Sequence, residues 1–523
     1  MRIVEIRDLD GPNLFLMSPA IKVELGDIPE NQTQSVIDEL TDTIADLHRA
    51  LGLEVPQMHS RKMEEAGHIT VAFEWSQRAF ATSLGTWAGQ LITGERSNRD
   101  QVVEELREIM DREPDEDDAP LLVRATADRA PIVSVTGTNG KTTTSRLIAF
   151  TLHHAGNSVG LTSSAGVFID KQRVLKGDYS GPSGARRVME HAGVNYAVLE
   201  TARGGLLLRG CGYEAADVAV ITNVTEDHLG IHGIHSIEGL AEVKAIVARN
   251  VKPGGFCVLN ADNEYTLAMR EQTPGVPVLF SAIPNNDIIQ NHLADGGSAV
   301  HVDKDKNVVW KHEVKSEIVA PLANIPMTFN GLARHQVENA LAAIGGLIGI
   351  GLPMDDIRGG LAAFKSTAEN SQGRLNLFEI NGGTVVIDFA HNEAGLVHLL
   401  NFARNFVGKD GRLISVVGTA GDREDDALRA IVRRAMESAD SVVLKDSVHY
   451  LRGREPGDML AVMRQEAEKH NSRNISIEEA ADERAATLQM VEQMQPGDVV
   501  AVMCVEDYEH LIEELGKIGV EVA

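Results

Sequence analysis

The stretch Val135-Thr-Gly-Thr-Asn-Gly-Lys-Thr-Thr-Thr-Ser145 decides the fold of the middle of this chain. It follows an apolar run at residues 131–135 and opens a helical pattern over residues 142–153, which is the strand, loop and helix context of a phosphate-binding loop. It departs from the Walker-A pattern G-x-x-x-x-G-K-[ST], because Val135 holds the place of the first glycine and an extra glycine lies at Gly137. The stretch therefore predicts a nucleotide site but leaves open which kind of ATP user carries it.

The residue types of this loop match the needs of a bound nucleotide. Backbone N–H groups of the loop and the amino end of the following helix can hold phosphate oxygens. Lys141 can reach the β and γ phosphates, and the Thr142 hydroxyl can ligate Mg²⁺. We therefore expect ATP and Mg²⁺ as cofactors. The loop residues expected to bind ATP are Gly137, Thr138, Asn139, Gly140, Lys141, Thr142 and Thr143.

Composition limits the possible functions. The chain has 523 residues, which suggests three domains. Its 49 Lys and Arg residues against 76 Asp and Glu residues give a formal charge of -27, which disfavours binding to nucleic acid or to an anionic membrane. No run approaches about 18 apolar residues, and the first residues lack a signal-peptide pattern. Because the three cysteines are also too widely spaced for a metal or disulfide framework, we expect a soluble, cytoplasmic protein.

The chain divides at a charged, proline-bounded stretch, residues 111–120, which predicts a linker because it cannot bury apolar area. Beyond it, apolar β-branched runs alternate with helical segments. We expect an α/β protein of three domains: an α+β N-terminal domain, a central P-loop ATPase domain with a parallel sheet, and a C-terminal Rossmann-like α/β domain. The expected boundaries are residues 1–115, an acidic linker at 116–128, and then 129–372 and 373–523.

Two acidic motifs lie at strand ends downstream of the loop. Glu200 follows the apolar run 196–199, and Asp227 and His228 follow the run 218–221. Because the carboxyl ends of parallel strands meet at the edge that carries the phosphate loop, we expect Glu200 and His228 to converge on Mg²⁺ and the triphosphate. A zinc site is a weaker alternative, because glycines interrupt the histidine run that would form it. Those histidines are His228, His232 and His235.

Four motifs together resemble the Mur ligase superfamily of ATP-dependent amide ligases. They are the strand-borne TGTNGKTTT, the glutamate of ETARGG at Glu200, the TNVTEDHLG at residues 222–230, and Lys244 in Glu-Val-Lys. Three motifs look most like the ligase half of cyanophycin synthetase: DYSGP at 178–182, ETARGGLLLR at 200–209 and LRGR at 451–454. The resemblance runs from about residue 130 to the end. The N-terminal region, with GPN at 11–13 and VAFEW at 71–75, is similar to that family's N-terminal domain.

The resemblance implies roles for single residues. Lys244 matches a lysine that is often carbamylated in the superfamily, which would make it an anionic metal ligand; an unmodified lysine is the alternative. The catalytic residues implied are Lys141, Glu200, His228, Lys244 and His391, and the metal ligands implied are Thr142, Glu200, His228 and Lys244. The further ATP-binding residues implied are Asn223, Gln336, Asn339, Arg374 and Asp388. Gln336 replaces the usual asparagine and keeps its amide chemistry with a longer reach.

The chemistry expected of such a site is amide formation. A carboxylate is a poor electrophile, so ATP would first convert it to an acyl phosphate, from which an amine displaces phosphate. Cations of the site would neutralise the transferring phosphoryl group. We expect an ATP-dependent carbon–nitrogen ligase that forms ADP and phosphate and joins an amino acid to a carboxylate of a peptide-like acceptor. Arginines in glycine-rich loops are expected to bind substrate carboxylates, namely Arg203, Arg209, Arg452 and Arg454.

The chain departs from cyanophycin synthetases between its N-terminal and ligase parts. Those enzymes carry an ATP-grasp domain there, whereas this chain has the acidic linker. With one recognisable ATP site, we expect one kind of addition. The acidic loop at residues 421–426 is either a site for a cationic amino acid or a solvated loop. The alternatives left open are a murein- or folylpolyglutamate-type ligase and a non-catalytic ATP-binding regulatory protein, with a homo-oligomer as one possible assembly.

Overall fold

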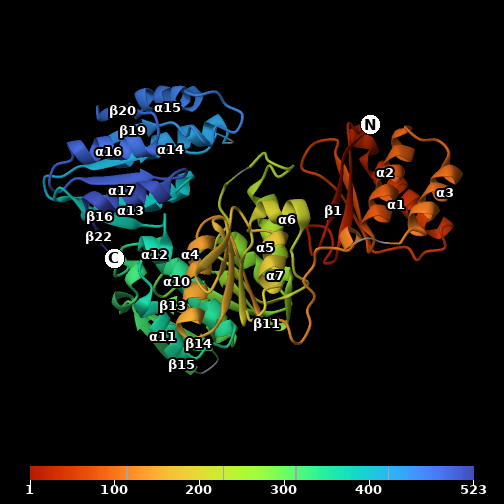
Figure 1. The fold of residues 1–523 in the computed structure, drawn as a ribbon, viewed down its shortest axis with the longest axis horizontal. Helices are drawn as coiled ribbons and strands as arrows, with labels where there is room; N and C mark the ends of the chain where they lie inside the picture. Colours follow the sequence, from red (N-terminus) through yellow and green to blue (C-terminus); the bar gives the residue numbers. More distant parts are fainter. Residues whose placement is uncertain (114–115, 228, 313–314, 422, 523) are drawn as a thin grey trace.

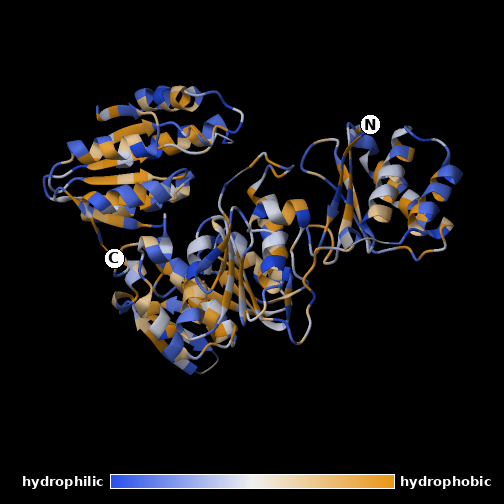
Figure 2. Cartoon of the chain, viewed as in Figure 1, coloured by the Kyte–Doolittle hydropathy of each residue, from blue (hydrophilic) through white to orange (hydrophobic). Residues whose placement is uncertain are grey.

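The computed structural model describes residues 1–113, 116–227, 229–312, 315–421 and 423–522. Over these residues the chain forms three sheets that follow one another along the sequence, each with its own helices (Figure 1). Hydrophobic residues concentrate in the strands and on the helix faces that pack against them (Figure 2). The α/β organisation expected from the sequence, with three domains, is confirmed.

The N-terminal domain is an antiparallel sheet that carries helices on one face. Its strand order is β1-β2-β4-β3, with β1 (Arg2–Leu9), β2 (Ala20–Gly26), β3 (Met58–Lys62) and β4 (Ile69–Glu74). Its helices are α1 (Thr33–Ala50), α2 (Arg78–Thr93) and α3 (Arg99–Met110). The core forms where alternate strand residues such as Val23 and Phe73 meet helix residues such as Leu40 and Leu84.

The central domain carries an 11-stranded sheet within the described residues, in the order β15-β14-β13-β12-β11-β10-β5-β9-β6-β7-β8. From β13 to β6 in this order the strands are parallel, and antiparallel hairpins extend both edges. The strands are β5 (Ile132–Thr136), β6 (Val159–Ser163), β7 (Gly166–Ile169), β8 (Gln172–Lys176), β9 (Tyr196–Glu200), β10 (Ala216–Ile221), β11 (Val251–Asn260), β12 (Val276–Ser281), β13 (Ser298–Val302), β14 (Asn307–His312) and β15 (Lys315–Pro321). The phosphate loop follows β5, which lies inside the parallel part.

Helices cover both faces of the central sheet, as expected for parallel strands that are buried on two sides. One face packs against α4 (Lys141–His154), α10 (Arg334–Gly349) and α11 (Met354–Ala363); the other packs against α5 (Pro182–Met189), α6 (Arg203–Arg209), α7 (Ile237–Arg249), α8 (Glu264–Ala268) and α9 (Asp287–Ala294). The small residues of α10 allow close packing: a Cβ on Gly345 would lie 2.7 Å from Val258. The short helix α12 (Ala368–Ser371) leads to the next domain.

The C-terminal domain has a seven-stranded sheet over the described residues, in the order β20-β19-β18-β21-β17-β16-β22. The strands are β16 (Asn376–Ile380), β17 (Gly383–Asp388), β18 (Leu413–Val417), β19 (Ser441–Lys445), β20 (Ser476–Ala480), β21 (Val499–Met503) and β22 (Val520–Val522). The helices are α13 (Glu393–Ala403), α14 (Asp425–Ser438), α15 (Asp458–Lys469), α16 (Glu483–Gln493) and α17 (Tyr508–Ile518). Parallel strands β17 to β19 and β21 are the four apolar runs visible in the sequence.

The N-terminal domain docks on the α6 and α7 side of the central domain (Figure 1). The backbone N–H of Asp10 donates to the carbonyl of Arg209 at 2.8 Å, and that of Cys211 donates to Pro12 at 2.7 Å. Glu64 accepts hydrogen bonds from the His235 N–H and the Ser236 hydroxyl, immediately before α7 begins. In the part of the chain that the structure covers, no helix is long and apolar enough to cross a membrane.

Candidate active site

The phosphate loop has the backbone geometry that its glycines permit. Gly137 and Gly140 have φ angles of 146° and 89°, which disfavour other residues. A Cβ on Gly140 would lie 2.2 Å from Asn339 Oδ1, so this glycine also allows α10 to approach the loop. Lys141 Nζ donates hydrogen bonds to the carbonyls of Gly137 (3.0 Å) and Thr138 (2.7 Å). The amino end of α4 and a folded-back ammonium thus form an anion site.

Glu200 is the last residue of β9, beside β5, and its side chain is aimed at the loop. It is 3% exposed, and its Oε2 has no hydrogen-bond partner among the described residues. Burial raises the pKa of Glu200, while the nearby Lys141 and a hydrogen bond from Thr142 act in the opposite direction. A buried carboxylate oxygen without a partner, next to the Thr142 hydroxyl, is a donor set of the kind that Mg²⁺ prefers. The residues present therefore fit the expected metal.

Lys244 lies on α7 and is 3% exposed. Its Nζ donates to the carbonyl of Gly137 at 2.9 Å, the same carbonyl that Lys141 binds. Burial lowers the pKa of Lys244 well below its ordinary value, and the charge of Lys141 lowers it further. A lysine that is readily neutral is the form needed for carbamylation, so the position is compatible with the modified and the unmodified residue.

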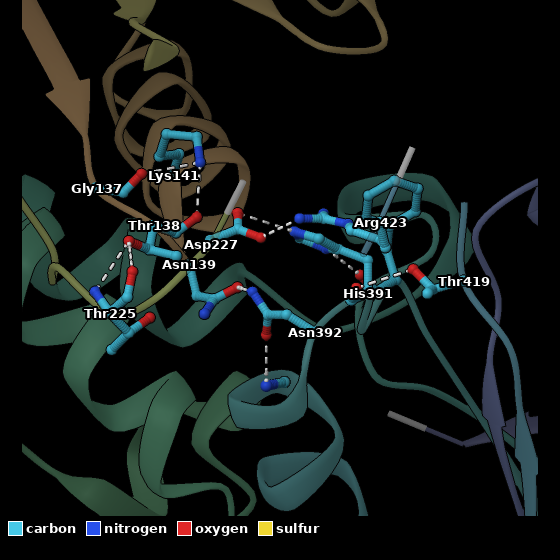
Figure 3. A network of polar contacts seen from close by, with 12 residues as sticks. Gly137, Thr138, Asn139, Lys141, Thr225, Asp227, His391, Asn392, Thr419 and Arg423 are labelled. Carbon is cyan, nitrogen blue, oxygen red and sulfur yellow. Dashed lines mark hydrogen bonds and ion pairs between the residues drawn. The ribbon is translucent and has the colours of Figure 1, made fainter. Parts of the chain in front are cut away.

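Residues of the C-terminal domain reach the same loop (Figure 3). Asn392 Nδ2 donates to Asn139 Oδ1 at 3.4 Å, and His391 Nε2 lies 3.7 Å from Asp227 Oδ2. Arg423 donates to Asp227 Oδ1 at 2.5 Å. Asn392 thus contacts the phosphate loop itself, 253 residues earlier in the chain, and His391 and Arg423 contact the neighbouring loop through Asp227, as expected of a site shared by two domains.

A cavity of about 470 Å³ extends from the phosphate loop between the central and C-terminal domains. The predicted nucleotide residues Asn223, Gln336, Asn339, Arg374 and Asp388 all line it, together with loop residues Thr138 to Thr143. Its size and position suit a nucleotide. Elsewhere in the cavity lining, the rings of His335 and His398 approach to 5.1 Å across the domain boundary. Burial, with His398 beside it, lowers the pKa of His335 to about 3, so this ring is neutral at neutral pH.

Two of the residues that line the cavity are held by the start of the C-terminal domain. Asp388 ends β17, and its Oδ2 accepts a hydrogen bond of 3.0 Å from the Leu375 N–H. Burial raises the pKa of Asp388, and the neighbouring Arg374 opposes that shift. The Arg374 guanidinium lies over the Phe389 ring at 4.4 Å from its centroid. Such stacking orients a cation toward the phosphate end of the cavity.

The four predicted substrate arginines do not gather in one place. Arg203 donates to the carbonyl of Ile231, in the loop that carries Asp227. Arg209 pairs with Asp8 (3.4 Å) and Asp10 (2.8 Å) of the N-terminal domain, so its guanidinium is engaged in the docking of that domain. Arg452 is exposed and lies over the Tyr450 ring. Arg454 binds the loop 421–425 of its own domain.

The predicted metal ligand His228 lies outside the described residues. Within the ranges that the structure does describe, no group of three or more His, Cys, Asp and Glu side chains is placed to hold a metal ion. His232 has a φ of 57° and lies in a loop, which agrees with the expectation that the histidine run forms no zinc-binding helix.

Sequence reasoning missed several residues of the site. Arg423 lies in the loop at residues 421–426, whose sequence is conspicuous only for its acidic residues. His398 lies on a helix whose sequence pattern shows only its apolar face. Asn392 carried a local signal, because an asparagine directly before a helical pattern is a typical N-cap; its side chain accepts from Gly395 at 2.8 Å. No local signal could have shown that Asn392 contacts the phosphate loop, that Arg423 contacts Asp227 or that His398 contacts His335.

Comparison with known proteins agrees with the fold. The family models for the Mur ligase middle domain and for the Mur ligase glutamate ligase domain match residues 135–347 and 373–504. A cyanophycin synthetase of Synechocystis sp. is 36% identical over 73% of this chain and 43% of its own length. A UDP-N-acetylmuramoyl-L-alanyl-D-glutamate--2,6-diaminopimelate ligase of Clostridium botulinum is 30% identical over 56% of this chain and 57% of its own. The structure of E. coli FolC in complex with DHPP and ADP matches 74% of this chain and 88% of its own, with a TM-score of 0.53 and 18% identity, a likeness in fold alone.

The fold and the loop define a P-loop protein whose nucleotide cavity is completed by a second α/β domain. The chain carries both the Mur ligase middle domain and the Mur ligase glutamate ligase domain and belongs to the Mur ligase family. Over 61% to 73% of its length the chain is similar to cyanophycin synthetases. The chain spans 36% to 43% of the length of the cyanophycin synthetases from Crocosphaera subtropica and Synechocystis sp..

Proposed function

We propose that this protein uses ATP to join an amino acid to a carboxylate of a peptide-like acceptor, with release of ADP and phosphate. The observation that carries the proposal is the convergence of Lys141, Glu200 and Lys244 at one sheet edge, under a domain that contributes Arg374 and His391. Two buried lysines and a buried carboxylate, one oxygen of which has no hydrogen-bond partner among the described residues, suit a metal-bound triphosphate. The similarity to cyanophycin synthetases supports a peptide-like acceptor.

In the first step, an oxygen of the acceptor carboxylate attacks the γ-phosphorus of ATP. The bond from that phosphorus to the bridging oxygen breaks, and ADP leaves with its electron pair. Lys141 and Arg374 stabilise the charge on the transferring oxygens, and the N–H groups of the loop hold the remaining phosphates. Thr142 and Glu200, with His228 and a carbamylated Lys244, would hold Mg²⁺, which when bound would neutralise part of the charge on the phosphates.

In the second step, the amine nitrogen attacks the acyl carbon and phosphate leaves with the electron pair of its bond. The amine must lose a proton, and the acyl phosphate must be kept from water. Domain contacts such as Asn392 with Asn139 describe how the C-terminal domain closes over the loop. We further propose that the protein makes a single kind of addition, since the chain presents one recognisable phosphate loop.

The decisive experiment measures ADP release with a panel of amino acids and acidic peptides, with and without hydroxylamine. We expect release only with a matched acceptor and amine, and a hydroxamate when hydroxylamine replaces the amine. If no pair of amino acid and acceptor raises ADP release above background, the ligase proposal is wrong. That result would favour a regulatory protein that binds ATP without catalysis. Activity on a folate or muropeptide acceptor, but on no aspartyl or glutamyl peptide, would favour the folylpolyglutamate- or murein-type alternative.

A further inference from the structure

The C-terminal domain places a buried arginine against the loop that adjoins the phosphate site. Arg423 lies between β18 and α14, and 7% of its side chain is exposed. Its Nη1 donates to Asp227 Oδ1 at 2.5 Å, and Asp227 belongs to the central domain (Figure 3). One domain thus delivers a cation to a carboxylate of the other, within electrostatic reach of Lys141.

Asp227 does not satisfy the whole guanidinium. Among the described residues, the buried Nε of Arg423 has no hydrogen-bond partner. A buried N–H without a partner is costly, and a guanidinium presents its N–H groups as a fork that matches two oxygens of a carboxylate or phosphate. An unpartnered donor on a residue already aimed at the site therefore points to an oxyanion ligand.

The loop that carries Arg423 is held in place by Arg454. The Arg454 guanidinium donates to the carbonyls of Gly421 (3.0 Å) and Arg423 (2.6 Å) and pairs with Asp425 at 2.8 Å. These contacts fix the backbone on both sides of Arg423. The arginine is therefore preorganised, which lowers the entropy lost when it binds a ligand.

Cationic side chains gather near Asp227. Its carboxylate lies 3.7 Å from the His391 ring and within electrostatic reach of Lys141, Lys244 and Arg203, in addition to its contact with Arg423. Glu200 and Asp178 also act on Lys141, so Asp227 is one of three carboxylates near this group. The guanidinium groups of Arg203 and Arg423 keep their charge and can stabilise a further negative charge placed between them. A phosphoryl group in transfer is such a charge.

We propose that Arg423 is a catalytic arginine, supplied by the C-terminal domain, that donates Nε–H to the oxyanion of the transferring phosphoryl group and of the resulting acyl phosphate, with Asp227 as its positioning residue. The inference rests on the proposed ligase function. The bonds made and broken are those of the first step above; Arg423 moves no proton and stabilises charge on oxygen. Because Arg423 belongs to the C-terminal domain, phosphoryl transfer would also depend on the closure of this domain over the central domain.

The test uses the full-length protein and a donor and acceptor pair for which the wild type releases ADP. We expect R423A to lower kcat about 10³-fold while the affinity for a fluorescent ATP analogue changes less than threefold. R423K, which keeps the charge but not the fork, should recover less than a tenth of the wild-type kcat. Added guanidinium or methylguanidinium should restore R423A activity in a saturable manner, which a purely structural role would not produce.

The matched control is R429Q, on α14, because Arg429 pairs only within its own domain, with Asp425 and Asp426. R429Q should keep kcat within twofold. The proposal is wrong if folded R423A keeps its kcat within twofold of the wild type. It is also wrong if R423A loses activity that guanidinium does not restore, while R423K has the full wild-type kcat. A wild type without substrate-dependent ADP release would instead contradict the ligase function itself, so the two failures are distinguishable.

Discussion

Lys244 Nζ donates a hydrogen bond of 2.9 Å to the carbonyl of Gly137, so a buried lysine contacts the backbone of the phosphate loop. Lys141 binds the same carbonyl at 3.0 Å. Two amines on one carbonyl oxygen are tolerated because burial lowers the pKa of both lysines and so reduces their repulsion. Substitution of either lysine should therefore change both the turnover and the free energy of unfolding, and both can be measured.

Replacing Lys244 by Met should stabilise the ligand-free protein and abolish turnover. Because the folded-state pKa of Lys244 is lowered, the unfolded chain binds more protons between that pKa and the ordinary value, so Lys244 makes stability rise with pH across this window. Its removal should raise Tm by at least about 2 °C at pH 7 and flatten the pH dependence. Differential scanning calorimetry at pH 6 to 9 checks this, with exposed Lys252→Met as the control. A lower Tm for K244M would contradict it.

Glu200→Gln should separate metal binding from folding. The pKa of Glu200 is raised by burial, so the folded protein holds its proton to higher pH than the unfolded chain, and stability falls as pH rises through that window. The neutral amide should therefore leave the ligand-free Tm equal or higher at pH 7. It should remove most of the stabilisation given by Mg²⁺ with ATP, and lower kcat about 10²-fold or more. A full Mg²⁺·ATP shift in E200Q would show that Glu200 holds no metal.

Gly140→Ala should prevent nucleotide binding through the clash with Asn339. Its matched control is Gly156→Ala, at the end of α4, where φ is 86° and a Cβ would meet nothing within 4 Å. Both substitutions bear the left-handed backbone strain of about 1 kcal/mol or more. Only G140A should lose ATP binding, by at least about 10-fold in Kd, as measured by isothermal titration calorimetry. Equal losses in both variants would assign the effect to strain.

Arg209→Gln should act on domain docking before it acts on substrate binding. Asp10 is fully buried, and Arg209 and Arg78 are both paired with it. Loss of one partner should destabilise the protein by about 1–3 kcal/mol and expose the linker near residues 111–131 to protease. Limited proteolysis and urea unfolding check this. A variant of unchanged stability with a raised KM for the acceptor would restore Arg209 as a substrate residue.

The sequence was most informative where strands are buried on both faces. Runs such as Pro131 to Val135 and Leu413 to Val417 are continuous and apolar because helices cover them on two sides, so their pattern is visible without the fold. Edge strands were missed for the opposite reason: β20 reads Ser-Ile-Glu-Glu-Ala and β3 reads Met-His-Ser-Arg-Lys, because solvent on one side permits charge.

The residues of the candidate site also fall into those that the sequence predicts and those that it does not. The loop, Glu200 and Lys244 are recognisable because each belongs to a motif set by a strand end or a loop. Arg423 and His398 meet the site only when a whole domain folds over it, and the partners of Arg209 lie about 200 residues earlier in the chain. Contacts of this kind leave no local pattern, so a single sequence does not predict them.

The contact of Glu64 with the start of α7 ties the most distant domain to the chemistry. Glu64 belongs to the N-terminal domain, yet it accepts hydrogen bonds from His235 and Ser236 where α7 starts, and Lys244 lies roughly 12 Å farther along that helix. A displacement of Glu64 would therefore act on the first turn of the helix that presents Lys244 to the phosphate loop, so the N-terminal domain and the phosphate loop are mechanically coupled through one helix.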